Sequence, residues 1–415
     1  MRYIKKIAPI CGICMFALTA TTSAALLTIE QAVNIALENH LDIKIAANEE
    51  KASAYSLQSA KGSKGLSLSA SNNIYFKKPG GSASSSNSDL ILSLPLYSGG
   101  KTEGNIKIAE TDMAIAERNS AKAKLDVKSN TISYYLNVIK THQAQLVAQE
   151  TVDNYQLHLK NVQEQYSVEN IAKSDVLRSE VELADAQQTL LQAENAYVVA
   201  VNTLKKQLRW KEAEELELVE EFQYEPFPMS MEDSVAYAKT HNPELERYRL
   251  AVHSAEQSVV VAKADRKPEV SLTSGVGWSD VSIGKNSEDT YIGLTTSWNL
   301  FDSQVTKSNV EKAKVAADNA RLELETQEDS VELATKEYYL NMKEAEKRRD
   351  TAQLSISKAK EDYLIAAAKY RVGEGVILDI IDSQLALTTA QNNYIEAQYA
   401  YADYKVKLEN VIGMN

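Results

Sequence analysis

An internal duplication constrains the fold of this 415-residue sequence more than any other feature. The segment Tyr134-Tyr135-Leu136 returns 204 residues later as Tyr338-Tyr339-Leu340. The same offset relates Asp175, Ser179, Leu183, Ala186, Gln187, Ala193, Ala196, Tyr197 and Leu204 to Asp379, Ser383, Leu387, Ala390, Gln391, Ala397, Ala400, Tyr401 and Leu408. Chance does not keep one register over so many positions, so the chain is built from two copies of one unit.

Each copy has the same predicted order of elements, helix–strand–strand–helix, and the two copies are expected to form one intertwined domain. The first structural repeat covers residues 25–228 and the second covers 229–415. The patterns predict first helices over Thr28–Ala60 and Met229–Ala264, strands over about 65–97 and 268–300, and long helical segments over 101–208 and 303–413. The sequence does not indicate a role for the acidic linker from Trp210 to Pro228.

The long helical segments carry a seven-residue repeat. In the second repeat its members are Val310, Ala317, Leu324, Val331, Tyr338, Ala345, Ala352, Ala359 and Ala366. The first repeat keeps a similar row from Ile106 to Val162, with interruptions at Ser120 and Thr141. A strict seven-residue repeat imposes a left-handed supercoil on partner helices, and so much alanine indicates close helix approach. A coiled-coil rod satisfies this pattern equally well.

The strand segments alternate apolar with small polar residues, which a rod does not explain. In the second repeat the apolar positions are Val270, Leu272, Val276, Trp278, Ile292, Leu294, Trp298 and Leu300. Each segment has about the ten residues that a tilted strand needs to cross a bilayer. Trp278 and Trp298 are candidates for an interfacial aromatic girdle. Surface hairpins packed on helices would show the same alternation, and period-2 patterning alone does not separate the two.

Four strands per chain are too few to close a membrane barrel, because the smallest known barrels have about eight. An open strand edge in lipid leaves backbone groups unpaired, at several kcal/mol each. If these strands lie in a membrane, at least two copies of the chain must assemble.

The N-terminus reads as a signal peptide over residues 1–24, with a basic start, an apolar stretch and small residues ending at Ala24. Both cysteines, Cys11 and Cys14, lie inside it. Removal takes away three basic residues, so the net charge falls from −12 to −15. An exported chain this acidic argues against nucleic acid as a partner. No later stretch has the roughly 18 consecutive apolar residues of a membrane-spanning helix, which leaves a periplasmic, secreted or barrel protein.

The mature chain resembles the TolC-like outer-membrane efflux protein family, in which outer-membrane factors serve efflux and type I secretion systems. The resemblance is carried by the duplicated unit and by Leu27-Thr28-Ile29-Glu30-Gln31-Ala32, Leu94-Pro95-Leu96-Tyr97-Ser98-Gly99-Gly100, Trp298-Asn299-Leu300-Phe301-Asp302 and Tyr370-Arg371-Val372-Gly373-Glu374-Gly375. It implies a mainly α protein with a transmembrane β-barrel portion: a homotrimer whose twelve-stranded barrel in outer-membrane lipid continues into a twelve-helix coiled-coil tunnel. It further implies a long periplasmic extension, a periplasmic adaptor protein, and an inner-membrane pump or ABC exporter.

The resemblance also places the functional residues. Asp379 and Asp382 fall where the family has its entrance aspartates, Asp175 is the equivalent in the first repeat, and Tyr370 matches a tyrosine of the closing network. Gly375 replaces an arginine of the best-known member, so Arg178 and Lys173 are candidate gate cations. The adaptor-docking tips are expected around Val168, Val372, Gly373 and Gly375. Alternatively, these aspartates have no gating role and are present because carboxylates are favoured near the N-terminus of a helix.

Neither catalysis nor a metal site is predicted. The five histidines, His40, His142, His158, His241 and His253, are scattered and interpreted as ordinary surface or interface residues. A phosphate-binding loop and a nucleophile elbow are both missing. We therefore expect a passive channel with no cofactor and no enzymatic activity. A periplasmic coiled-coil adaptor remains an alternative, although it should carry a membrane anchor and compact β-domains; a secreted structural rod or adhesin explains the heptads only.

Overall fold

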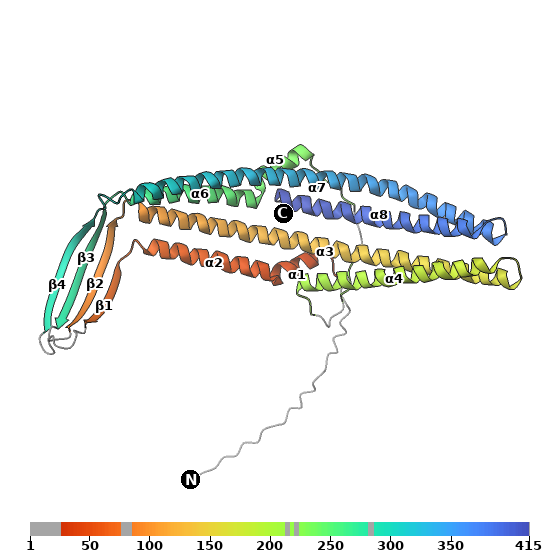
Figure 1. Ribbon diagram of the computed structural model, residues 1–415, viewed down its shortest axis with the longest axis horizontal. Coiled ribbons are helices and arrows are strands. Elements are labelled where there is room, and N and C mark those ends of the chain that lie inside the picture. Colours follow the sequence, from red (N-terminus) through yellow and green to blue (C-terminus); the bar gives the residue numbers. More distant parts are fainter. Residues whose placement is uncertain (1–25, 76–84, 212–215, 220–223, 281–285, 415) are drawn as a thin grey trace, which may run out of the picture.

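The computed structural model describes residues 26–75, 85–211, 216–219, 224–280 and 286–414, so the expected signal peptide lies outside the described residues. Eight helices and four strands make up this described part (Figure 1). They are α1 (Ile29–Asn39), α2 (Leu41–Gly62), β1 (Ser67–Tyr75), β2 (Ser85–Tyr97), α3 (Lys101–Ser167), α4 (Lys173–Leu208), α5 (Met231–His241), α6 (Pro243–Ala264), β3 (Glu269–Asp280), β4 (Asn286–Ser297), α7 (Val305–Arg371) and α8 (Ile377–Ile412). The duplicated order of elements is confirmed.

The first helix of each repeat is broken, where the sequence predicted one continuous helix. The breaks fall at the equivalent residues His40 and Asn242, each of which caps the following helix. The Asn242 Oδ1 accepts hydrogen bonds from the backbone N–H groups of Glu244 at 2.7 Å and Leu245 at 3.0 Å. Pro243 follows at the first position of α6, where its fixed φ favours a new helix start. The single-helix prediction was therefore wrong, because capping chemistry overrides the apolar periodicity.

Two very long helices organise the molecule. α3 and α7 have 67 residues each, about 100 Å of continuous helix at 1.5 Å per residue, and both run the length of the helical body (Figure 1). On the sheet side the helices pack in the order α2, α3, α6, α7, and on the far side in the order α4, α3, α8, α7. The far side thus consists of two hairpins, α3–α4 and α7–α8. None of the described helices is long and apolar enough to cross a membrane.

The four strands form one antiparallel sheet in the order β1-β2-β3-β4. Because paired residues share a face, the register gathers Leu68, Ala70, Leu90, Leu92, Leu94, Leu272, Val276, Trp278, Ile292 and Leu294 on one side and Ser67, Ser69, Ser71, Asn73, Ser93, Ser271, Thr273, Gly275, Gly277, Gly293 and Thr295 on the other. The predicted alternation is confirmed at most positions; Ile91 and Tyr291 lie on the polar side, and Ser274, Thr290 and Glu288 on the apolar side. The sheet projects beyond the helices, and no helix of the described chain covers either face (Figure 1). The alternative of hairpins packed on helices is therefore wrong.

The seven-residue rows lie on the buried faces of the long helices. In α7 the buried members are Val310, Ala317, Val331, Ala345, Ala352 and Ala366. In α3, Ser120 is buried and continues the row that the sequence had interrupted there. Tyr134 is exposed, whereas the adjacent Tyr135 is buried, and its hydroxyl proton is shared between the carbonyls of Leu27 and Val219, both at 2.8 Å.

We expect Asn242→Ala to lower the free energy of unfolding by about 2 kcal/mol. The variant loses the cap of α6, worth roughly 1 kcal/mol, and the buried hydrogen bond that its Nδ2 donates to the Val411 carbonyl at 2.7 Å. Chemical denaturation of the detergent-solubilised protein, followed by far-ultraviolet circular dichroism, measures the change. Asn39→Ala is the matched control, since Asn39 is exposed and bonds only within its own helix. Equal losses in both variants would contradict this account of the break.

Candidate functional site at the far end of the helices

The far end of the helical body consists of two turns with the same geometry. In the turn over 168–172, Glu169 takes a φ of 58°, and in the turn over 372–376, Gly373 takes a φ of 79°. In each turn a backbone N–H reaches the carbonyl five residues earlier: Asn170 to Gln165 at 3.0 Å, and Glu374 to Lys369 at 2.9 Å. This is the Schellman pattern of a helix end. Val168 and Val372 lie exposed in these turns, so the duplication extends to the tips.

Gly375 packs against the end of its own helix. A Cβ at this position would lie 3.0 Å from the backbone N of Tyr370 and 3.2 Å from the carbonyl carbon of Lys369. Those contacts are with backbone atoms, which give way only if the turn shifts. Gly375, which stands where the best-known family member has an arginine, therefore lies in a turn that packs directly against the end of α7.

Asp379 and Asp382 lie one turn apart on the exposed side of α8. Ile377, Ile380 and Ile381 form the opposite face and are buried. Because this apolar face packs into the core, it fixes the orientation of α8 about its axis, and the two carboxylates point away from the core. Asp379 also lies in the first turn of α8, where a carboxylate is favoured by the helix dipole.

The other charged candidates are not brought together with these aspartates in one chain. Asp175 is half-buried in the first turn of α4, while Lys173 and Arg178 are exposed. Within the described residues of a single chain, neither cation forms an ion pair. The two hairpins thus present Asp175 and the Asp379–Asp382 pair at equivalent places.

His158 is the residue that the sequence analysis missed at this end. It lies on α3, is 6% exposed, and its ring centroid is 5.3 Å from that of Tyr370 on α7. The Nε2 of His158 and the hydroxyl of Tyr370 are both buried without a hydrogen-bond partner among the described residues. Burial lowers the pKa of His158 to about 4, while burial and the nearby charge of Asp175 raise the pKa of Tyr370. Nothing in the spacing of the histidines signals this contact, because it joins the two repeats.

The two hairpins meet along a polar seam between α3 and α8. From the middle of the molecule toward the tips, its contacts are Asp126–Asn410 at 3.1 Å, Ser133–Asp403 at 2.6 Å, Lys140–Glu396, Glu150–Gln391 at 3.1 Å, Thr151–Thr388 at 2.9 Å and Asn154–Gln384 at 3.1 Å. The first three contacts are spaced seven residues apart on both helices, as expected for supercoiled partners. These polar contacts lie beside an apolar cluster near the tips, in which Val152, Tyr155 and Val162 of α3 pack with Ile377, Ile380 and Ile381 of α8. Separating the hairpins therefore also exposes apolar surface.

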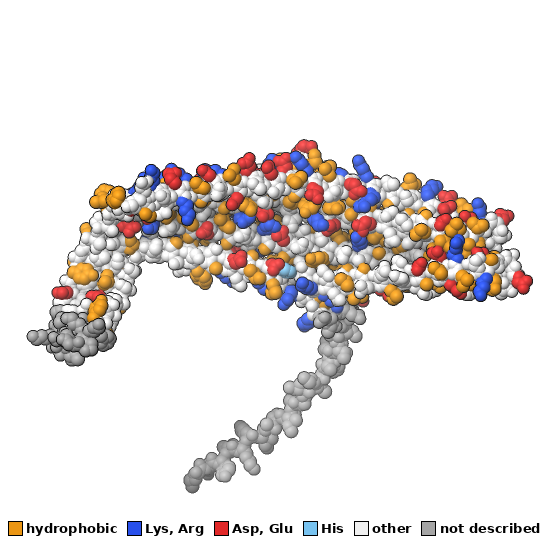
Figure 2. All heavy atoms as spheres, in the orientation of Figure 1, with side chains coloured by type: hydrophobic (Ala, Val, Ile, Leu, Met, Phe, Trp, Pro, Cys, Tyr) orange, Lys and Arg blue, Asp and Glu red, His pale blue; other side chains and the backbone are white. Residues whose placement is uncertain are grey.

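The opposite end of the molecule carries the two tryptophans. Trp278 lies toward the hairpin ends of the sheet beside Glu288, and Trp298 directly follows β4, ten residues beyond Glu288. The Trp298 Nε1 donates to the Arg266 carbonyl at 3.1 Å, next to the helices. At about 3.3 Å per residue the two levels are roughly 33 Å apart along the strand. Figure 2 shows charged side chains of both signs along the helical body and few on the visible side of the sheet.

An amphipathic four-stranded sheet continued by two helical hairpins defines the class of outer-membrane exit ducts with a periplasmic helical tunnel. The profile of the family described as outer membrane efflux protein matches residues 32–208 and 235–414, and the chain belongs to this family. The chain is 19% identical to the outer membrane efflux protein BepC of Brucella suis biovar 1 (strain 1330) over 335 residues, which are 74% of this chain and 69% of that protein.

Further likenesses agree with this assignment. The alkaline protease secretion protein AprF of Pseudomonas aeruginosa is 22% identical over 306 residues, 69% of this chain and 63% of that protein. The crystal structure of the Campylobacter jejuni CmeC outer membrane channel superposes with a TM-score of 0.82 at 18% identity, covering 93% of this chain and 85% of that chain. At this identity the superposition shows the shared fold.

Acidification is expected to loosen the tips through His158. Since the buried imidazole has its pKa lowered from 6.5 to about 4, its contribution to stability is complete above pH 6.5 and is lost as the pH falls toward 4. The loss amounts to ~3 kcal/mol at most. Hydrogen exchange of peptides from both tips, measured by mass spectrometry at pH 7.5 and 4.5 and corrected for intrinsic rates, reports it.

His158→Phe should abolish most of this pH dependence, because the phenyl ring fills the same space without titrating. His253→Gln serves as the control, since His253 is exposed on α6. A pH response that survives in His158→Phe would show that groups other than His158 drive it.

Proposed function

We propose that the protein is a passive trimeric exit duct for efflux or type I secretion. Three chains would form a twelve-stranded barrel in the outer membrane and a twelve-helix tunnel extending through the periplasm. The duct would dock with a periplasmic adaptor and receive its cargo from an inner-membrane pump or ABC exporter. The chain itself supplies neither an energy source nor a catalytic step.

The open edges of the sheet carry this proposal. Within the described residues β1 and β4 each have a strand partner on one side only. The helices have matching free edges, with α2 and α4 on the β1 side and α7 on the β4 side. The helices at these edges carry exposed apolar residues, among them Leu177, Val181, Leu191 and Val198 on α4 and Leu333, Leu340, Leu354 and Leu364 on α7. Joining the β4 edge of one copy to the β1 edge of the next would pair the free backbone groups of the strands and cover the exposed apolar residues of the helices. Repeated around an axis, such a heterologous contact can close into a ring.

The dimensions of the sheet fit a bilayer. Between Trp278 and Trp298 the strands span roughly 33 Å, and a tilt of about 40° reduces this to a height of about 25 Å, the height of the apolar band of outer-membrane barrels. The apolar face would contact lipid, and the Ser-, Thr- and Gly-rich face would line the lumen. The two tryptophans would then lie at opposite interfaces.

The far end would form the entrance. In a threefold assembly, Asp379 and Asp382 of the three chains would form a ring of six carboxylates, which favours cations. Tyr370 and Asp175 would help to hold the entrance closed, and Lys173 and Arg178 would supply its cations. The turns at Val168 and at Val372, Gly373 and Gly375 are the outermost parts of both hairpins, which supports them as adaptor-docking tips.

Planar-bilayer recording of the purified protein in a salt gradient tests the proposal. We expect small, long-lived, cation-selective openings. The double variant Asp379→Asn/Asp382→Asn should reduce the cation-to-anion permeability ratio by at least about fivefold, since one unit charge at 4 Å in water is worth ~1 kcal/mol.

The matched control is Glu323→Gln/Glu325→Gln, which removes two exposed carboxylates from the sheet side of α7. If the control lowers selectivity as much as the entrance variant, the ring is rejected. A monomeric protein that needs no detergent and gives no conductance would reject the duct and favour the periplasmic rod or adaptor.

A further inference from the structure

The described parts of the linker between the repeats contact the helices near the middle of the molecule, and these contacts suggest a role for them. We propose that described linker residues 216–219 and 224–227, here called the strap, position α7 and α8 against the first repeat and thereby set how far the entrance opens at rest. This inference rests on the proposed channel function and identifies Tyr224 as a positioning residue distant from the entrance.

The first end of the strap is fixed to the first repeat. The Leu27 N–H donates to the Glu217 carbonyl at 2.8 Å, and the Val219 N–H donates to the Leu27 carbonyl at 3.1 Å, which makes a short parallel bridge. The buried Tyr135 of α3 donates its hydroxyl to the carbonyls of both Leu27 and Val219. The strap therefore starts from a rigid point on α3.

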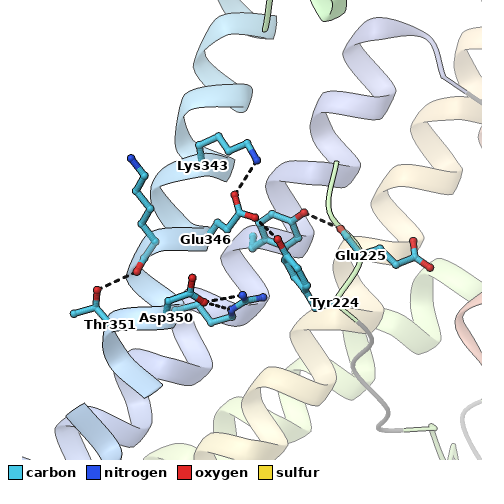
Figure 3. Close-up of polar contacts among 9 residues, drawn as sticks. Tyr224, Glu225, Lys343, Glu346, Asp350 and Thr351 are labelled. Atoms are coloured by element: carbon cyan, nitrogen blue, oxygen red, sulfur yellow. Dashed lines mark hydrogen bonds and ion pairs between the residues drawn. The ribbon is translucent and has the colours of Figure 1, made fainter. Parts of the chain in front are cut away.

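The second end is fixed to both helices of the second repeat (Figure 3). The Tyr224 hydroxyl donates to Glu346 of α7, which also accepts from Lys343 at 2.8 Å. The guanidinium of Arg349 lies 3.9 Å from the centroid of the Tyr224 ring, a cation–π contact. Two groups of α7, Glu346 and Arg349, thus contact Tyr224, and Lys343 contacts Glu346.

The neighbouring strap residues reach α8 and the core. Buried Tyr401 of α8 donates to the Glu225 carbonyl at 2.7 Å, and Lys405 pairs with the Glu225 carboxylate at 3.2 Å. Phe227 is buried with Met342, Ala345 and other residues of both helices. Tyr135 of the first repeat and Tyr401 of the second repeat therefore each donate to a carbonyl of the strap.

The strap contacts α3 and α7 near the middle of both helices. Tyr135 lies at the middle of α3, where this helix exchanges α2 and α6 for α4 and α8 as neighbours. Glu346 and Arg349 lie on α7 just past its middle, on the side of the tips. On the sheet side of this level the repeats are joined by the sheet and by the packing of α3 on α6, and on the tip side they are joined along α3 and α8. An outward movement of the α7–α8 hairpin would then pivot at the strap.

Loss of the Tyr224 contacts should release this hairpin while the ends of both long helices at the sheet stay in place. We expect Tyr224→Phe, which keeps the ring and removes the hydroxyl, to raise the resting open probability by about fivefold, the effect of losing one ordinary hydrogen bond. Tyr224→Ala, which also removes the cation–π contact, should raise it further. Glu346→Gln should resemble Tyr224→Phe, because it weakens the same bond.

Spin-label distances test the movement separately from conduction. No cysteine follows Cys14, so Val372→Cys places one label per chain at the α7–α8 tip and Val168→Cys does so at the α3–α4 tip. In a threefold assembly each label gives one interchain distance, measured by double electron–electron resonance. We expect the strap variants to lengthen the distance at 372 more than the distance at 168.

Tyr134→Phe and Tyr134→Ala are the matched controls, since Tyr134 is 37% exposed on α3 and Tyr224 is 38% exposed. They should change neither the distances nor the open probability. Unchanged distances at 372 in Tyr224→Phe and Tyr224→Ala, in a protein that conducts and assembles normally, would overturn the strap alone. A missing interchain distance in the protein with an unchanged strap would reject the assembled channel, and the strap proposal with it.

Discussion

Unpaired backbone at the two outer edges of the sheet is the constraint on which the rest of the structure depends. A row of free N–H and C=O groups on β1 and β4 is tolerated in water only at the risk of aggregation, and in lipid it costs several kcal/mol per group. No helix among the described residues covers these edges or the apolar face of the sheet. A solution that satisfies both features is a closed ring of several chains in a membrane.

The long helices follow from the same constraint. Each strand pair feeds directly into α3 or α7, so the spacing of the strands around a ring also fixes the spacing of the helices. Alanine-rich heptads allow neighbouring helices to approach closely and to supercoil. The interface of α3 with α8 combines polar contacts along its length with an apolar cluster near the tips. The two hairpins are thus joined by both kinds of contact.

Much of this could be predicted from the sequence because it is periodic. The 204-residue offset, the heptads of α7 and the alternation of β3 and β4 depend only on neighbours along the chain. The breaks at His40 and Asn242 were missed, although Asn242-Pro243 is a capping signal, because the apolar pattern continues through them. The burial of Tyr135 in place of Tyr134, the His158–Tyr370 contact and the anchoring of Tyr224 depend on residues far apart in sequence. No local pattern encodes them.

The number of chains in the membrane-extracted protein tests the central claim most directly. Native mass spectrometry of the complex, released from detergent, should give three times the mass of the mature chain, with single chains appearing only under strong activation. A stable single chain that remains folded without detergent would contradict the account, because the open edges of its sheet would then be satisfied without a partner.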